Sequence, residues 1–133
     1  MRQQMILFAV MITLPLSGQA AEPMGGAEFD RYTQGKTLFY GFDGTAYGVE
    51  RYLSGRRVIW SFLDGRCQSG QWYEDGEQIC FVYEDNNLPQ CWSFVLTPKG
   101  LTARFQNDPQ ATELYESGDI DEEMLCLGPE VGV

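Results

Sequence analysis

The sequence contains no histidine, and this absence argues against several kinds of chemistry at once. Histidine is the usual general base near neutral pH, the usual partner of a serine or cysteine nucleophile, and the commonest zinc ligand. Closely spaced cysteine pairs such as C-x-x-C, which zinc sites and redox enzymes use, are also missing. We therefore predict no catalytic residue, no metal site and no cofactor, and the sequence favours a binding protein over an enzyme.

Basic residues are scarce in this chain. Nine Lys and Arg residues stand against 19 Asp and Glu residues, which gives a net charge of −10. Nucleic acids and anionic membrane surfaces would repel such a protein, so neither is an expected partner. The charge is compatible with a basic protein partner or an unidentified small molecule, and it also promotes solubility.

Long apolar runs are absent except for one near the N-terminus. Residues 5–16 are apolar, but a membrane span needs about 20 such residues. The run follows Arg2 and precedes the small residues SGQA, which is the layout of a secretory signal peptide. We predict a signal peptide over residues 1–20, cleaved after Ala20 or alternatively after Ala21, and a periplasmic or secreted mature protein with no stable membrane insertion. Arg2 is the single charged residue removed, so the mature net charge becomes −11.

The rest of the chain, residues 21–133, is predicted to be one domain with an acidic tail over 117–133. A short amphipathic helix is expected over 26–34, and beyond Gly35 the apolar period changes to two, which is typical of strands. Asp-Gly pairs at 43–44, 64–65 and 75–76 favour tight hairpin turns. The expected strands are 37–42, 45–53, 56–63, 66–74, 78–84, 89–96 and 101–105, with 112–116 as an eighth candidate.

Turns this short leave no room for crossover helices, so consecutive strands should be antiparallel neighbours. The predicted fold is mainly β: an up-and-down meander of about seven or eight strands that forms a small barrel or half-barrel, with the short helix at its N-terminal side. A strongly bent open sheet is the alternative.

Four cysteines in an exported chain indicate two disulfides. If Asp85-Asn86 is a two-residue turn, Cys80 faces Cys91 across a hairpin, and the same register gathers the neighbouring aromatic side chains on the other face. A bond here would stabilise the fold by roughly 3 kcal/mol. The remaining pair, Cys67 and Cys126, would then attach the tail to the sheet.

Aromatic residues are abundant, with 3 Trp, 7 Tyr and 8 Phe. The ordinary interpretation is core packing, because small barrels are normally filled by side chains. The functional alternative is a barrel mouth lined by aromatics that binds an apolar or sugar-like ligand. The candidate ligand-facing residues are Tyr47, Trp60, Trp72 and Trp92.

Carboxylates raise two further alternatives. A glycosidase-like hydrolase needs two carboxylates about 5–10 Å apart. The three aspartates at 43, 64 and 75 are explained by turn chemistry, and nothing distinguishes a catalytic pair among the remaining acids, which include Glu50 within a strand. Acids at 119, 121, 122 and 123 could offer calcium ligands, but they lack the EF-hand spacing. Both alternatives are weaker than a binding role.

Several motifs follow one another in a suggestive order: GKTL at 35–38, G-x-W at 70–72, ICF at 79–81, QCW at 90–92 and CLGPEVGV at 126–133. This order resembles a family of small exported proteobacterial proteins of unknown function, over nearly the whole chain from about Phe29 onward. The resemblance implies a periplasmic β domain with disulfides. It implies no activity, ligand or catalytic residue.

The leading hypothesis is a non-enzymatic periplasmic or secreted binding module that presents an aromatic and acidic surface or pocket. An inhibitor of a basic secreted enzyme such as a lysozyme is the alternative, because complementary charge would steer that encounter. A carboxylate-dependent hydrolase comes third.

Overall fold

The computed structural model describes residues 11–14, 21–108, 110, 112–118, 120 and 122–127. Most of the predicted signal peptide, residues 1–10 and 15–20, therefore lies outside the described residues. Of the residues that are described, no helix is long and apolar enough to span a membrane. This described part of the chain contains one helix, α1 (Gly26–Thr33), and one 3₁₀ turn (Ser54–Arg56). Its strands are β1 (Thr37–Phe42), β2 (Thr45–Tyr52), β3 (Arg57–Ser61), β4 (Gln68–Asp75), β5 (Gln78–Tyr83), β6 (Asn86–Thr97), β7 (Gly100–Phe105) and β8 (Glu113–Glu116).

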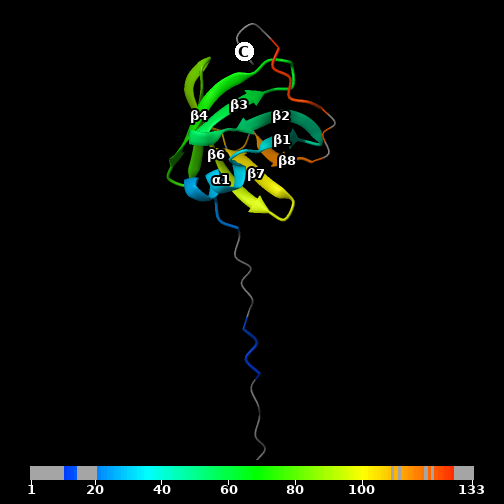
Figure 1. The fold of residues 1–133 in the computed structure, drawn as a ribbon. Coiled ribbons are helices and arrows are strands. Elements are labelled where there is room, and N and C mark those ends of the chain that lie inside the picture. Colours follow the sequence, from blue (N-terminus) through cyan, green and yellow to red (C-terminus); the bar gives the residue numbers. More distant parts are fainter. Residues whose placement is uncertain are drawn as a thin grey trace, which may run out of the picture.

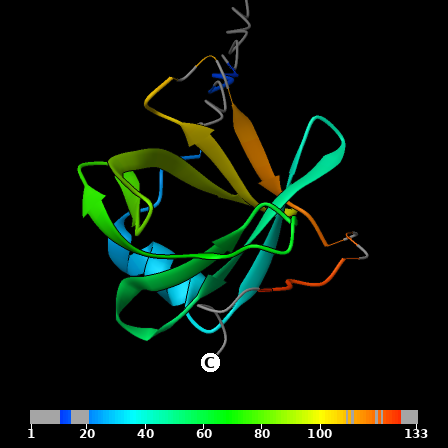
Figure 2. The same ribbon diagram turned by 90° about the horizontal axis from the view of Figure 1, so that it is seen from above.

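The strands form a closed barrel in sequence order, and every neighbouring pair is antiparallel. The last strand returns to the first, with Tyr40 opposite Glu116 and Gly41 opposite Tyr115. Figure 1 shows the helix lying against this barrel, and Figure 2 shows the strands running round a ring. The predicted up-and-down meander with an N-terminal helix is confirmed, and it closes into a barrel instead of remaining an open sheet.

Local turn chemistry explains why the strands are short and sequential. Asp43 and Gly44 both have positive φ, 49° and 80°, as a type I′ turn requires. The tight turn predicted at Asp64-Gly65 is wrong, because this pair lies within a longer connection, residues 62–67, between β3 and β4. At the third pair, Asp75 is still paired with Gln78, so the turn consists of Gly76 and Glu77.

The β5–β6 hairpin differs from its prediction in one detail. Its turn is Glu84-Asp85, one residue earlier than expected, with Tyr83 opposite Asn86. An irregularity in β6 then restores the predicted register, so Cys80 faces Cys91. Pro89 lies in this irregular part, where a residue without an N–H can be accommodated.

Both predicted disulfides are present. Cys80 is bonded to Cys91 across the hairpin, and Cys67 is bonded to Cys126, which attaches the C-terminal segment near the start of β4. The backbone N–H of Leu127 also donates to the carbonyl of Gly65. The tail is thus held by a covalent bond and by a hydrogen bond.

The helix packs against the barrel end at which β1 begins and β2 ends. Phe29 is completely buried and makes edge contacts with Tyr52 and Trp72, at centroid distances of 5.7 and 5.1 Å. It also packs on Phe94 at 4.5 Å. Met24 is buried beside it. This end of the barrel is filled by side chains.

Two glutamates fasten the helix to the strands. Glu74 accepts a hydrogen bond from the N–H of Gly26, at the start of the helix. Glu116 accepts from the hydroxyl of Tyr32 at 2.7 Å and from the N–H of Leu101 at 2.8 Å. Burial and this bond to Glu116 raise the pKa of Tyr32 to about 12, so the phenol remains a donor at neutral pH.

Candidate functional site

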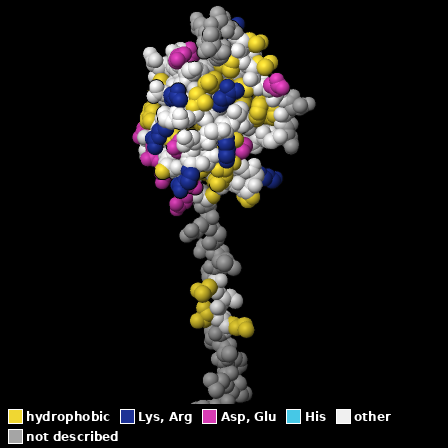
Figure 3. All heavy atoms as spheres, viewed as in Figure 1, with side chains coloured by type: hydrophobic (Ala, Val, Ile, Leu, Met, Phe, Trp, Pro, Cys, Tyr) yellow, Lys and Arg dark blue, Asp and Glu magenta, His cyan; other side chains and the backbone are white. Residues whose placement is uncertain are grey.

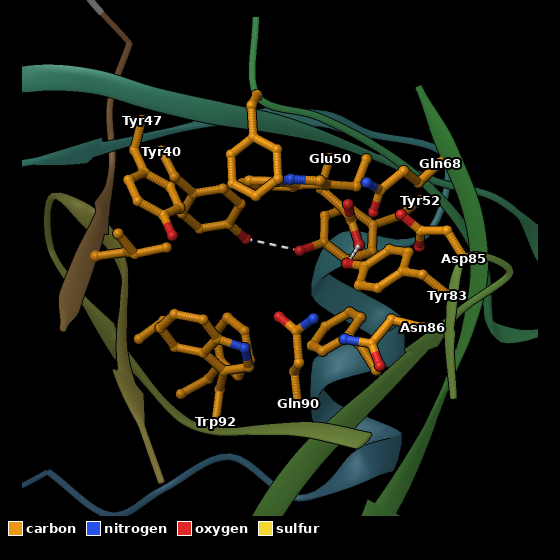
Figure 4. A pocket seen from close by; sticks show the side chains of 16 residues that line it. Tyr40, Tyr47, Glu50, Tyr52, Gln68, Tyr83, Asp85, Asn86, Gln90 and Trp92 are labelled. Atoms are coloured by element: carbon orange, nitrogen blue, oxygen red, sulfur yellow. Dashed lines mark hydrogen bonds between the residues drawn. The ribbon is translucent and has the colours of Figure 1, made fainter. Parts of the chain in front are cut away.

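The barrel end away from the helix contains a cavity of about 230 Å³. Its walls are inward-facing side chains of all eight strands together with residues of the adjoining loops, and Figure 4 shows them arranged around a hollow. Tyr52, Phe81 and Phe94 form part of its lining and also contact Phe29, so they separate the hollow from the packed end. The other lining residues are Tyr40, Tyr47, Glu50, Trp60, Phe62, Gln68, Tyr83, Asp85, Asn86, Gln90, Trp92, Ala103 and Leu114.

Aromatic rings make up one wall as a connected group. Trp60 lies 6.0 Å from Tyr47 and 5.3 Å from Phe62 between ring centroids, and 6.5 Å from Tyr40. Tyr47 is the extra residue of a β-bulge in β2, between Ala46 and Gly48, and a bulge can redirect a side chain towards the interior. Phe62 is 51% exposed, which places it at the mouth.

Two glycines make room for rings of this cavity. A Cβ atom on Gly48 would lie 2.3 Å from the indole of Trp60, and one on Gly70 would lie 2.7 Å from the ring of Tyr83. Neither distance is compatible with a side chain. The absence of a side chain at these two strand positions therefore fixes where Trp60 and Tyr83 can lie.

Hydroxyl groups are paired deep in the cavity. The hydroxyls of Tyr40 and Tyr52 are 2.7 Å apart, and Figure 4 shows this bond crossing the upper wall. Both side chains are buried, and burial raises the pKa of each hydroxyl. The pair is therefore uncharged at neutral pH and presents polar atoms in an otherwise aromatic surface.

Glu50 is the one buried carboxyl group among the described residues. It is 1% exposed, and its Oε1 atom accepts a hydrogen bond of 2.9 Å from the hydroxyl of Tyr83. Its Oε2 atom has no hydrogen-bond partner within the described part of the chain. Burial raises the pKa of Glu50 well above its usual range, although the bond from Tyr83 opposes this shift. A carboxyl group with a free polar atom thus borders an aromatic cavity.

Polar residues surround the other side of the hollow. Gln68 comes from β4, Asp85 from the β5–β6 turn, and Asn86 and Gln90 from β6. Figure 4 shows the Gln90 amide directed into the hollow, beside Trp92 and across from the two paired tyrosines. Amide groups both donate and accept hydrogen bonds, so this side can orient a ligand with polar atoms.

The structure brings three of the four predicted ligand-facing aromatics together. Tyr47, Trp60 and Trp92 all line the cavity. Trp72 does not, because it lies at the packed end against Phe29 and under the guanidinium of Arg56, at 4.5 Å from the ring. Whether the three lining residues face a ligand stays a prediction.

Sequence reasoning missed the deep polar residues of the cavity. The sequence pattern assigned no ligand-facing role to Glu50 or to the tyrosines at 40, 52 and 83. One signal was available, because Glu50 is two residues before the aromatic Tyr52 and so shares its face of β2. An acid on the inward face of a strand is unusual, and this could have identified it.

The acidic residues that the structure describes form no candidate metal site. Among the described residues, no group of three or more Cys, Asp or Glu side chains could hold a metal ion. Asp119 and Asp121, two of the four acids considered for calcium, lie outside the described residues. Figure 3 shows Lys and Arg side chains interspersed with acidic and hydrophobic ones on one face of the molecule.

Comparison with known proteins identifies no relative. No protein-family model, no curated protein and no solved structure matches this chain. The geometry of the cavity is therefore the basis for any functional conclusion.

Proposed function

We propose that the protein is an exported binding module that holds one small molecule inside its barrel. The observation that carries this proposal is the cavity of about 230 Å³ with its aromatic walls and convergent polar groups. Small-molecule sites are mostly apolar, contain a few placed polar groups, and run about 300–1,000 Å³. This cavity lies just below that range, so the expected ligand is compact, on the scale of a single ring with a short substituent.

The rigidity of the barrel supports a binding role. The strands form a closed ring, and the disulfide between Cys80 and Cys91 links two strands that both contribute to the lining. A cavity that exists before the ligand arrives avoids the loss of conformational entropy that ordering would require. Ligand pockets are commonly found in the mouths of β-barrels.

Export is the second part of the proposal. It is supported by the apolar run at 5–16, the small residues before Ala21, and the pairing of all four cysteines in disulfides. Mass spectrometry of the protein made from the full chain in a secreting host should give a mature form that begins at Ala21 or Glu22, with both disulfides intact. A form that retains residues 1–20 would contradict export by cleavage.

The binding role can be tested with a library of small neutral and charged ring compounds. A ligand that binds only the folded state raises the melting temperature, and the rise grows with the logarithm of the ligand concentration relative to its Kd. We expect members of the library to stabilise the wild type but not Ala103→Leu, because Ala103 is buried and lines the cavity, so a leucine there fills it. Ala27→Leu is the matched control, since Ala27 is exposed on α1.

Two results would contradict the binding proposal. One is a library in which no compound shifts the melting temperature of the wild type. The other is a set of ligands that stabilise Ala103→Leu as strongly as the wild type and Ala27→Leu, because such ligands would bind elsewhere.

The net charge of −10 supports an alternative in a different class, an inhibitor of a basic secreted enzyme such as a lysozyme. That role predicts salt-sensitive association with a cationic cell-wall hydrolase and loss of its activity. Full hydrolase activity at low salt would exclude this alternative for the enzymes tested. Glu50 and Asp85 both line the cavity, and hydrolysis by this pair would appear as product formation with glycoside substrates.

A further inference from the structure

We propose that the ligand of this cavity is a small organic amine in its cationic form, with its ammonium group paired to the carboxylate of Glu50. This inference rests on the proposed binding function and names the chemical class of the ligand. It follows from three features of the lining: a buried oxygen without a partner, a surplus of acidic over basic groups, and a wall of aromatic rings.

The buried oxygen is the first feature. Oε2 of Glu50 is buried and has no hydrogen-bond partner within the described part of the chain, whereas Oε1 is held by Tyr83. Buried polar atoms of folded proteins are nearly always paired, and an unpaired one invites a specific explanation. Because Glu50 borders the cavity, a ligand that brings an N–H donor would satisfy this oxygen. An ammonium group carries three donors and no acceptor, so it matches a site rich in oxygen atoms.

Charge is the second feature. The described lining contains two carboxyl groups, Glu50 and Asp85, and no Lys or Arg. The titratable groups that interact with Glu50 are the hydroxyls of Tyr40 on β1, Tyr52 on β2 itself and Tyr83 on β5. Each of these is neutral or, if ionised, negative. A carboxylate or phosphate ligand would therefore find no positive partner here, whereas a cation would.

The aromatic wall is the third feature. Trp60 and Tyr47 lie 6.0 Å apart between centroids, and Trp92 contributes a ring from the opposite side of the hollow (Figure 4). The face of an aromatic ring attracts a cation, and tryptophan does so most strongly. The same rings can cover the hydrocarbon part of an amine. The cavity is thus suited to a molecule with an apolar body and one positive end.

The number of protons released on binding distinguishes a cationic amine from a neutral ligand. Burial raises the pKa of Glu50 and so favours its protonated form in the empty protein. An alkyl amine with a pKa of about 10 arrives already protonated at neutral pH, as lysine does. Pairing then requires the carboxyl proton to leave: the amine cation and the protonated Glu50 become an ammonium–carboxylate pair, and one proton passes to the solvent. A neutral ligand that binds the protonated carboxyl releases none.

Calorimetry with three matched probes tests the inference. The probes are phenethylamine, its neutral analogue 2-phenylethanol, and the anion phenylacetate, each titrated near pH 7 in two buffers of different ionisation enthalpy. We expect phenethylamine to bind at least about tenfold more tightly than 2-phenylethanol, as for hydrogen bonds between charged groups. Proton release of up to about one per phenethylamine bound is expected, and phenylacetate should not bind.

Glu50→Gln is the decisive variant, because it keeps the shape and an acceptor for Tyr83 but removes the carboxylate. It should weaken phenethylamine binding by about 10- to 100-fold, abolish proton release, and leave 2-phenylethanol binding unchanged. Glu28→Gln is the matched control: Glu28 is exposed on α1, and the same change in net charge there should have no effect on any probe. If Glu50→Gln fails to fold, the proton count and the probe preference of the wild type decide the question.

Several results would overturn the inference. Equal binding of phenethylamine and 2-phenylethanol with no proton release would refute the amine, while the binding function itself would stand. If Glu50→Gln and Glu28→Gln weakened phenethylamine binding equally, the amine would be attracted by the overall charge of the protein and not by pairing with Glu50 in the cavity. Absence of binding by all three probes would also refute the amine proposal. The binding function would then be tested separately by the compound library and the Ala103→Leu variant.

Discussion

The two ends of this barrel are built from the same strands, but one end is filled by side chains and the other contains a cavity. At the helix end, Phe29 is completely buried and four aromatic partners surround it. At the other end, the aromatics at 47, 60 and 92 surround a cavity of about 230 Å³. The difference lies in what enters from outside the sheet: a helix side chain fills one end, and none of the described residues fills the other. Stability should therefore be concentrated at the helix end and ligand binding at the open end.

The strongest way to break this comparison is to truncate a phenylalanine at each end. Phe29→Ala removes a fully buried ring, and the free energy of unfolding should fall by about 3–5 kcal/mol. Phe62→Ala makes the same chemical change at the mouth, where the side chain is 51% exposed, so its loss should be below about 1 kcal/mol. Urea denaturation of both variants measures the two losses. Equal losses would refute the division into two functional ends.

Adding a methyl group within the cavity wall should have the next largest effect. Gly48→Ala places a Cβ atom 2.3 Å from Trp60, so the indole must move or the strand must shift. We expect a loss of about 1–3 kcal/mol, typical of overpacking, together with a shift in tryptophan emission. Gly118→Ala is the control, because nothing lies within 4 Å of that position. An unchanged emission spectrum in Gly48→Ala would contradict the placement of Trp60.

The buried carboxyl predicts a pH dependence of stability. Above the ordinary pKa of 4.5 for Glu50, the unfolded chain loses a proton that the folded protein retains, because burial raises the folded pKa. The free energy of unfolding therefore falls as pH rises through this window, by up to about 1.4 kcal/mol per pH unit. Glu50→Gln removes this term.

Thermal denaturation from about pH 4 to about pH 8 checks that prediction. The melting temperature of Glu50→Gln minus that of the wild type should increase as pH rises above the ordinary pKa of 4.5 for Glu50. Below that pH the difference should be constant. Glu28→Gln, with the same charge change at an exposed position, should run parallel to the wild type. If the curve of Glu50→Gln ran parallel to that of the wild type, burial would not shift the titration of the Glu50 carboxyl in the wild type.

The smallest expected effect comes from the attachment of the helix. Tyr32→Phe removes the donor to Glu116 at 2.7 Å, and stability should fall by about 0.5–1.5 kcal/mol. Tyr73→Phe is the control, since Tyr73 is 41% exposed. Chemical denaturation of the two variants gives the difference. If Tyr73→Phe were the more destabilising of the two, the role assigned to Glu116 would be wrong.

The sequence predicts the barrel well because the rules involved are local. Alternation locates the strands, the Asp43-Gly44 turn has the two positive φ angles that its residues favour, and the hairpin register pairs Cys80 with Cys91. The turn at 84–85 was missed because an irregularity around Pro89 compensates for it further along the strand. Such compensation depends on the partner strand and leaves no local pattern.

The residues that line the cavity are harder to predict, because an inward side chain lines it only if it lies at the right position along the barrel axis. Trp72 and Trp92 both point inward, and alternation cannot tell them apart, yet one contacts Phe29 and the other lines the hollow. The level of each side chain is set by the stagger between strands and by the helix that fills one end. Glu50 was overlooked for a related reason, since its importance comes from neighbours on other strands.

Tryptophan fluorescence tests the division of the barrel most directly, because the three tryptophans are distributed between its ends. Trp60 and Trp92 line the cavity, while Trp72 packs at the helix end. Titration with phenethylamine should change the emission of Trp72→Phe, which keeps the two cavity tryptophans. It should leave the double variant Trp60→Phe/Trp92→Phe unchanged, because that variant keeps the indole at the packed end alone. A response that persists in the double variant, or that is absent from Trp72→Phe, would contradict the account.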